Sequence, residues 1–267
     1  MKSSAEEKYL FRGEVILFAE QGSQAPQVYF YSDVGIGHRD PVLVDDELQR
    51  IFYEEYYRRN PNRQVAPSTA WGGSRSDAQI QYLEDKSQLY LYENIRFLEI
   101  GFERADLGAS LRRRIPGTFG DAVIISEIAR DAVRNTANLS AILPRIEAAH
   151  GLYDVIFSSH AIKYSSNIEN DIARVDEVLR PGGVVFLEVP NCNSEFYRYN
   201  GIENSTNYYF NERGLHSISE YVGWEVQDIS HWGIDWYQYK KENKKLTLQK
   251  NESGVWVRAV FRKNISS

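Results

Sequence analysis

Four short apolar runs between residues 97 and 190 constrain the fold of this chain most strongly. They show little polar alternation, and helix-like segments or turns separate them. Strands of this composition are covered on both faces, which is typical of a parallel sheet flanked by helices. The pattern predicts a doubly wound α/β domain, in which ligands bind at the carboxyl ends of the strands. The runs are FLEIG at 97–101, AVIISEI at 122–128, YDVIFSSH at 153–160 and VVFLEVP at 184–190.

Helical periodicity accounts for the segments between the runs. Residues 107–114 and 130–143 read as helices, and no convincing third strand is apparent between the second and third runs. Ser166 followed by Glu169 has the spacing of a capping box at the start of a further helix. That helix is expected to stop at RPGG, just before the fourth run.

The C-terminal part continues the same domain. Asn211 is expected to cap a helix that ends at Gly223, and WEVQDI reads as a strand. The closing segment GVWVRAVFRK predicts an antiparallel hairpin at the edge of the sheet.

The first 70 residues form a different kind of segment. Residues 14–31 read as two short strands joined by a turn, and Asp45 is a plausible N-cap for the helix after it. The proline- and glycine-containing stretch 60–73 reads as a boundary, after which Ser76 and Gln79 have capping-box spacing. We therefore expect an N-terminal extension over 1–70, acting as a lid or as a structural cap, and the main domain over 71–267.

Charge and composition restrict the partners of the protein. The chain has 31 Lys+Arg and 37 Asp+Glu, a net charge of −6, which gives no field that attracts nucleic acid. A single cysteine, Cys192, excludes an internal disulfide and a Cys-based zinc site, and the five histidines are too scattered to predict any metal site. Since no apolar run is long enough to span a bilayer and no signal peptide is apparent, we expect a cytoplasmic protein.

The order of segments over about residues 75 to 262 resembles the class I S-adenosylmethionine-dependent methyltransferases. In that family an acid and a glycine-rich turn after the first strand hold the methionine part of the cofactor, and an acid after the second strand binds the ribose hydroxyls. FLEIG supplies Glu99 and Gly101 for the first position, and ISEI supplies Glu127 for the second. LRPGGVVFLEVPN and NYYFNERGLHSISEYVGWEV are similar to the fifth strand and the region after it in small-molecule and sugar methyltransferases.

This resemblance implies a mostly parallel, seven-stranded Rossmann-like sheet with an antiparallel C-terminal hairpin and an N-terminal α+β extension. It also implies S-adenosylmethionine as cofactor and a small-molecule acceptor, such as a sugar or nucleotide-sugar; a homo-oligomer is compatible with it. The cofactor-binding residues that it implies are Glu99, Gly101, Glu103, Arg104, Glu127, Ile128 and Ser158. The catalytic residues would be His160 and Tyr164, with Asn191, Tyr208 and Tyr209 at the acceptor.

Two features depart from the family pattern. Side chains follow Gly101 where the family usually has further glycines, so Glu103 and Arg104 either pair with the cofactor's amino-acid tail or fill its place. Twenty-eight positions separate Glu99 from Glu127, more than the roughly 20 expected for such a fingerprint.

Each candidate side chain also has a purely structural interpretation. Glu127 could be an exposed acid favoured by the dipole of a helix start, and Glu99 a buried acid satisfied by backbone amides. His160, as the candidate general base, could instead be hydrogen-bonded in a helix cap, and the tyrosines could serve packing alone. The sequence thus favours a small-molecule methyltransferase. The alternative is a non-catalytic binding or scaffold protein of the same fold. A nicotinamide oxidoreductase would need a glycine-rich turn that this sequence lacks.

Overall fold

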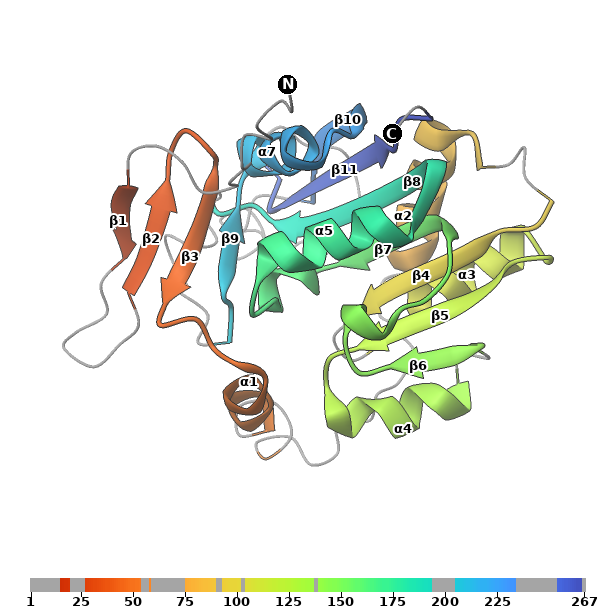
Figure 1. Ribbon diagram of the computed structural model, residues 1–267, viewed down its shortest axis with the longest axis horizontal. Coiled ribbons are helices and arrows are strands. Elements are labelled where there is room, and N and C mark those ends of the chain that lie inside the picture. Colours follow the sequence, from red (N-terminus) through yellow and green to blue (C-terminus); the bar gives the residue numbers. More distant parts are fainter. Residues whose placement is uncertain are drawn as a thin grey trace, which may run out of the picture.

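Two β-sheets organise the computed structural model of the protein (Figure 1). The structure describes residues 15–19, 27–53, 58, 75–89, 93–101, 104–136, 139–193, 205–233 and 254–265. Within these residues, no helix combines the length and the apolar character needed to cross a bilayer.

The larger sheet has seven strands in the order β10-β11-β8-β7-β4-β5-β6. All neighbours from β6 to β8 pair in parallel, whereas β11 runs antiparallel to both β8 and β10. This confirms the predicted mostly parallel sheet with an antiparallel C-terminal hairpin. The strands are β4 (Arg96–Gly101), β5 (Phe119–Ile124), β6 (Ala141–Leu143), β7 (Tyr153–Ser159), β8 (Leu179–Pro190), β10 (Glu225–Trp232) and β11 (Trp256–Arg262).

Strand β6 corrects the expectation that this region holds no third strand. Helix α4 (Glu127–Thr136) ends well before Leu143, to which the predicted helix extended. The strand has only three residues, all of them half-buried, and it pairs with β5 alone at the edge of the sheet. So short a segment carries no readable periodicity in the sequence.

Helices cover both faces of this sheet. On one face, α5 (Ile168–Val178) and α7 (Glu212–Val222) bury apolar stripes against β7, β8 and β11. On the other face, α2 (Arg75–Ser87) and α3 (Asp106–Arg114) pack against β4, β7 and β8. Figure 1 shows α5 in front of the sheet and α2 behind it. This double coverage explains why the central strands are apolar without alternation.

Several predicted helix boundaries shift in the structure. Asn167, not Ser166, caps α5: its side chain accepts a hydrogen bond from the amide of Asn170 at 3.1 Å. Helix α1 (Asp45–Phe52) already includes Asp45, and α2 already includes Ser76, so neither residue is the N-cap. RPGG lies within β8 rather than before it. By contrast, α7 begins after its Asn211 cap and ends at Gly223 with φ +80°, as predicted.

The smaller sheet joins the N-terminal segment to the rest of the chain. Its strands are β1 (Val15–Ala19), β2 (Gln27–Tyr31), β3 (Ile36–Asp40) and β9 (Tyr208–Phe210), all antiparallel, at the left of Figure 1. Strand β9 comes from the C-terminal half, so the edge of β3 is paired with a strand of the main domain. Helix α1 follows β3 and lies near the carboxyl ends of β4 and β5.

The cap of α5 gives a direct test of the corrected boundary. We expect Asn167→Ala to lower the free energy of unfolding by about 1 kcal/mol, because the first turn loses the acceptor for one of its free amides. The adjacent Ser166→Ala should change it by less than about 0.5 kcal/mol, since Ser166 is exposed and does not cap the helix. Urea unfolding of both variants measures the difference, and a larger loss for Ser166→Ala would contradict the assignment.

Candidate functional site

A cavity of about 270 Å³ opens at the carboxyl ends of β4 and β5. The strand order reverses at β4, because β5 pairs with one of its edges and β7 with the other. Ligands of open α/β sheets bind beside such a reversal. Acidic side chains outnumber basic ones around it. The residues that line it are Asp45, Asp46, Gln49, Ile100, Val123, Ile125, Glu127, Arg130, Pro144, Arg145, Ile146, Glu147, Tyr164, Ser165, Ser166 and Asp171.

The N-terminal helix α1 contributes the side chain that holds one wall of this cavity. Gln49 donates to the carbonyl oxygen of Ile125 at 2.7 Å and accepts from the amide of Glu127 at 3.0 Å. Both contacts fall on the turn between β5 and α4. Gln49 therefore fixes the backbone that carries Glu127.

Glu127 and Tyr164 are the two predicted site residues that the structure brings to the same cavity. Glu127 is exposed at the start of α4, and no residue of the described structure forms a hydrogen bond or ion pair with its carboxylate. Tyr164 lies in the short helix η5 (Ile162–Tyr164) after β7, where it packs with Leu43 and Leu48. The cavity thus has a carboxylate on the β5 side and an aromatic ring on the β7 side.

Asp171 adds a titratable group to the lining. It lies in the first turn of α5. Burial raises the pKa of its carboxyl to about 6, and the nearby charges of Glu147 and Asp45 also raise it, whereas a hydrogen bond from Ser165 lowers it. The charge of the cavity therefore becomes more negative as the pH rises through about 6.

Glu99 is buried outside the cavity lining and serves the start of α3. Its two carboxylate oxygens accept hydrogen bonds from the amides of Leu107 at 3.1 Å and Gly108 at 2.8 Å. The residue at the N-cap position, Ala105, has no side chain that could do so. Burial raises the pKa of Glu99 to about 8, although these amides lower it.

The turn after β4 is tight at Gly101. A Cβ atom there would lie 2.1 Å from the carbonyl oxygen of Arg104, a distance that excludes any side chain. Arg104 itself forms an ion pair with Asp106 at 3.0 Å, whereas Glu103 lies outside the described residues. Ile128 is 49% exposed on α4 and does not line the cavity.

His160 lies at the end of β7, away from the cavity lining, in a buried polar network. Its φ is +59°, its Nε2 atom is 2.9 Å from Oε1 of Glu188, and it also contacts Arg75. Burial and the charge of Arg75 lower its pKa to about 4, against the opposite influence of Glu188. The imidazole is therefore neutral near pH 7.

The remaining predicted residues serve the protein's own hydrogen bonds and cores. The hydroxyl of Ser158 accepts from the amide of Ile162 at 3.2 Å. Asn191 donates to the carbonyl oxygen of Gly254 at 3.2 Å. Tyr208 and Tyr209 are both buried on β9, in the smaller sheet.

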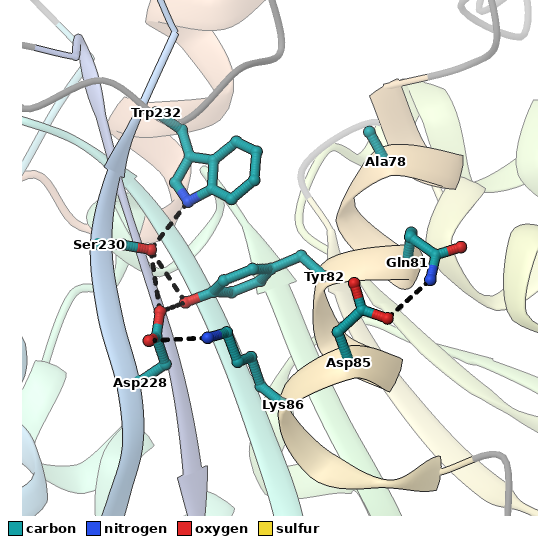
Figure 2. A pocket seen from close by; sticks show the side chains of 8 residues that line it. All are labelled: Ala78, Gln81, Tyr82, Asp85, Lys86, Asp228, Ser230 and Trp232. Carbon is teal, nitrogen blue, oxygen red and sulfur yellow. Dashed lines mark hydrogen bonds and ion pairs between the residues drawn. The ribbon is translucent and has the colours of Figure 1, made fainter.

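A second cavity, of about 310 Å³, lies between α2 and β10 (Figure 2). Its polar groups largely satisfy one another. Tyr82 donates to Asp228 at 2.6 Å, Ser230 donates to Asp228 at 3.0 Å, and Trp232 donates to Ser230 at 2.9 Å. Lys86 completes the set with an ion pair to Asp228 at 3.1 Å.

Sequence reasoning missed Gln49 and the buried charges Glu188 and Arg258. Gln49 carried no signal, because an amide on a predicted helix is ordinary. Glu188 and Arg258 did carry one: each is a single charged residue inside an apolar strand run, and such residues are buried only when they are paired. Among the described residues, no group of three or more His, Cys, Asp or Glu side chains is arranged to hold a metal ion.

Comparison with known proteins shows the fold. No family model and no curated protein matches the chain. The cyclase SpnF matches at a TM-score of 0.58 and 12% identity, over 84% of this chain and 98% of that one. The plantazolicin methyltransferase BamL, solved with SAH, matches at 0.57 and 12% identity, over 82% and 96%. This chain has the class I S-adenosylmethionine-dependent methyltransferase fold.

A third match has the same fold and extends over more of this chain. The 1,6-didemethyltoxoflavin-N1-methyltransferase of Burkholderia thailandensis, solved with S-adenosylhomocysteine, has a TM-score of 0.55 and 13% identity. It covers 90% of this chain and 99% of its own. Since the class I methyltransferase fold is shared by a cyclase and by methyltransferases, the reaction must be argued from the site.

The buried carboxyl of Glu99 generates a prediction about stability and pH. A carboxyl whose pKa is raised in the folded state binds more protons there than in the unfolded chain, so its contribution to stability falls as the pH rises from about 4.5 to about 8. We expect the stability of the wild type relative to Glu99→Gln to decrease over this window. Urea unfolding at several pH values measures it, with Glu225→Gln on exposed β10 surface as the control. A stability of the wild type that rises with pH relative to that of Glu99→Gln would contradict the prediction.

Proposed function

We propose that the protein binds S-adenosylmethionine in the cavity at the ends of β4 and β5 and transfers its methyl group to a small polar acceptor. The observation that carries the proposal is the carboxylate of Glu127, which lines this cavity in a chain of the class I methyltransferase fold and has no partner among the residues that the structure describes. A carboxylate at a strand end accepts two hydrogen bonds from a vicinal diol, as the ribose of the cofactor presents. Gln49 supports this role by fixing the backbone on which Glu127 stands.

The electrostatics of the cavity fit a cationic ligand. Asp45, Asp46, Glu147 and Asp171 line it together with Glu127, against two arginines. One of these arginines, Arg145, already pairs with Asp45 at 3.7 Å. The excess of negative charge would attract a ligand that carries a sulfonium and an ammonium group.

When bound, the cofactor supplies an electrophilic methyl group, and the chain has to align the acceptor and take up its proton. Tyr164 lines the cavity and is the better placed of the two proposed catalytic residues to orient an acceptor hydroxyl. His160, with its lowered pKa and its contacts to Glu188 and Arg75, is a weak base in this arrangement. We propose that His160 instead holds the end of β7 in position beside the acceptor. A sugar or nucleotide-sugar hydroxyl or carbon remains our preferred acceptor.

A non-catalytic binding or scaffold protein is the second candidate function. Two observations favour it: each carboxyl oxygen of Glu99 accepts a backbone amide, and Arg104 is paired with Asp106 and does not line the cavity. A cyclase among the structural neighbours also means that the fold does not require methyl transfer. Cofactor binding separates the two functions, because the scaffold does not need it.

Calorimetric titration with S-adenosylmethionine and with its demethylated product tests the proposal. We expect micromolar binding by the wild type, and Glu127→Ala should weaken it about 10- to 100-fold, because charged hydrogen bonds contribute roughly 1.5 to 3 kcal/mol. The control is Glu225→Ala, an exposed glutamate on β10 that does not line the cavity. No heat at millimolar ligand, or equal affinity for the Glu127→Ala and control variants, would contradict the assignment.

The carboxyl of Asp171 adds a dependence on pH. Because the pKa of this group is about 6, its negative charge develops as the pH rises through that value. A cationic cofactor should therefore bind more tightly at pH 7.5 than at pH 5, and Asp171→Asn should reduce this dependence. Calorimetry across this range measures it; an unchanged pH profile in the variant would show that Asp171 does not contribute.

A further inference from the structure

A buried ion-pair network joins β8, β11 and α2 at the end of β7. Glu188 lies opposite Arg258 in the antiparallel pair of β8 and β11, and the side chains of both are fully buried. The carboxylate of Glu188 accepts from Nε of Arg258 at 2.5 Å, from Gln79 at 2.8 Å and from Arg75. His160 contacts the same oxygen that Gln79 and Arg75 contact.

The network has an excess of positive charge. Although burial raises the pKa of Glu188, Arg75 and Arg258 hold it well below its usual value, so the carboxylate is ionised. His160 is neutral near pH 7, since burial and Arg75 lower its pKa to about 4. Two guanidinium cations thus share a single carboxylate, and a buried charge without a counter-charge is costly.

Arg258 has donors that no group among the described residues accepts. Its Nη1 and Nη2 atoms are buried and have no hydrogen-bond partner in the part of the chain that the structure describes, and only Nε reaches Glu188. The buried Nε atom of Arg75 is likewise without a hydrogen-bond partner among these residues. A buried charged donor without an acceptor destabilises a folded chain more than a neutral one does, so an acceptor is expected at this place.

Aromatic rings hold both guanidinium groups in position. Arg258 lies 4.3 Å from the ring centroid of Trp232, and Arg75 lies 4.3 Å from that of Trp256. Trp232 is itself held by its hydrogen bond to Ser230, within the chain of contacts in Figure 2. Stacking leaves the N–H edge of a guanidinium, rather than its face, to bind oxygen atoms.

The network is also reachable from solvent on one side. The side chains of Arg75 and His160 are 24% and 22% exposed, whereas those of Glu188 and Arg258 are 0% exposed. It stands at the carboxyl ends of β7 and β8, the same edge of the sheet on which the cavity at β4 and β5 opens.

We propose that Arg258 and Arg75 form a binding subsite for an anionic group, a carboxylate or a phosphate, of the acceptor molecule. The assignment to an acceptor rests on the proposed methyl transfer; the anion site itself rests on the unpartnered donors. A planar guanidinium presents paired donors that match the oxygen atoms of either anion. Binding would neutralise the excess positive charge, and it would satisfy the Nη donors of Arg258 once the side chains that bury them move aside.

Thermal unfolding of the full chain in sodium phosphate and in sodium acetate, at constant ionic strength set with sodium chloride, tests the site. We expect the Tm of the wild type to rise with the concentration of at least one of these anions, as for a ligand that binds only the folded state. Phosphate alone, or acetate alone, would identify which anion the subsite accepts. No rise with either would overturn the proposal.

Arg75→Gln is the decisive variant, because Arg75 is partly exposed and its loss is more easily tolerated than that of buried Arg258. It should raise the apparent Kd for the anion about tenfold or more, and Arg258→Lys, which keeps the charge but loses the planar donor pair, should do the same if it folds. The matched control Arg213→Gln removes an arginine that pairs with Glu220 on the surface of α7 and should titrate like the wild type. Equal titrations of wild type, Arg75→Gln and Arg213→Gln would show general salt effects and overturn the proposal.

Cofactor calorimetry separates failure of this site from failure of the proposed function. Arg75 does not line the cavity at β4 and β5, so Arg75→Gln should bind S-adenosylmethionine as the wild type does. A wild type that binds phosphate or acetate but not S-adenosylmethionine would retain the anion subsite and contradict methyl transfer. A wild type that binds the cofactor but neither anion would contradict the subsite alone.

Discussion

The burial of β4 on both faces and both edges is the constraint on which the rest of the structure depends. Its side chains alternate between the core beneath α5 and the core beneath α3, and its edges pair with β5 and β7. Because the strands on either side run parallel to it, their carboxyl ends meet at one edge of the sheet. Every group that we connect with function lies along that edge: the cavity lining with Glu127, the end of β7 with His160, and the ion-pair network around Glu188.

The acid after β4 shows how one residue can satisfy a sequence motif and a structural need together. Glu99 stands where the family resemblance predicts an acid, yet its oxygens accept the two amides at the start of α3. The helix begins after Ala105, which has no capping side chain, so a carboxylate from the neighbouring strand takes that role. The motif predicts that this carboxylate binds the cofactor; the contacts in the structure show that it caps the start of α3.

Much of the architecture could be predicted from local patterns. The apolar runs gave β4, β7 and β8, and the Asn211 and Gly223 signals gave both ends of α7. The second run, 122–128, covers only the end of β5 and continues into the start of α4. The predictions that were wrong also concern short local segments. A three-residue edge strand such as β6 has no period to read, and Asn167 stands beside a serine with an equally good capping pattern. In the candidate site, Glu127 and Tyr164 share a cavity, whereas His160 belongs to a network whose other members came from distant segments.

The sequence by itself determined the class of fold and the placing of acids at strand ends, because apolar runs, caps and turns are properties of neighbouring residues. Only the tertiary structure decided which side chains meet. Gln49 reaches Glu127 across 78 positions, and Arg258 reaches Glu188 across 70. No local period encodes such distances: they depend on how the sheet orders its strands and on which face each side chain points to. The unpartnered donors of Arg258 become visible only when that burial is known.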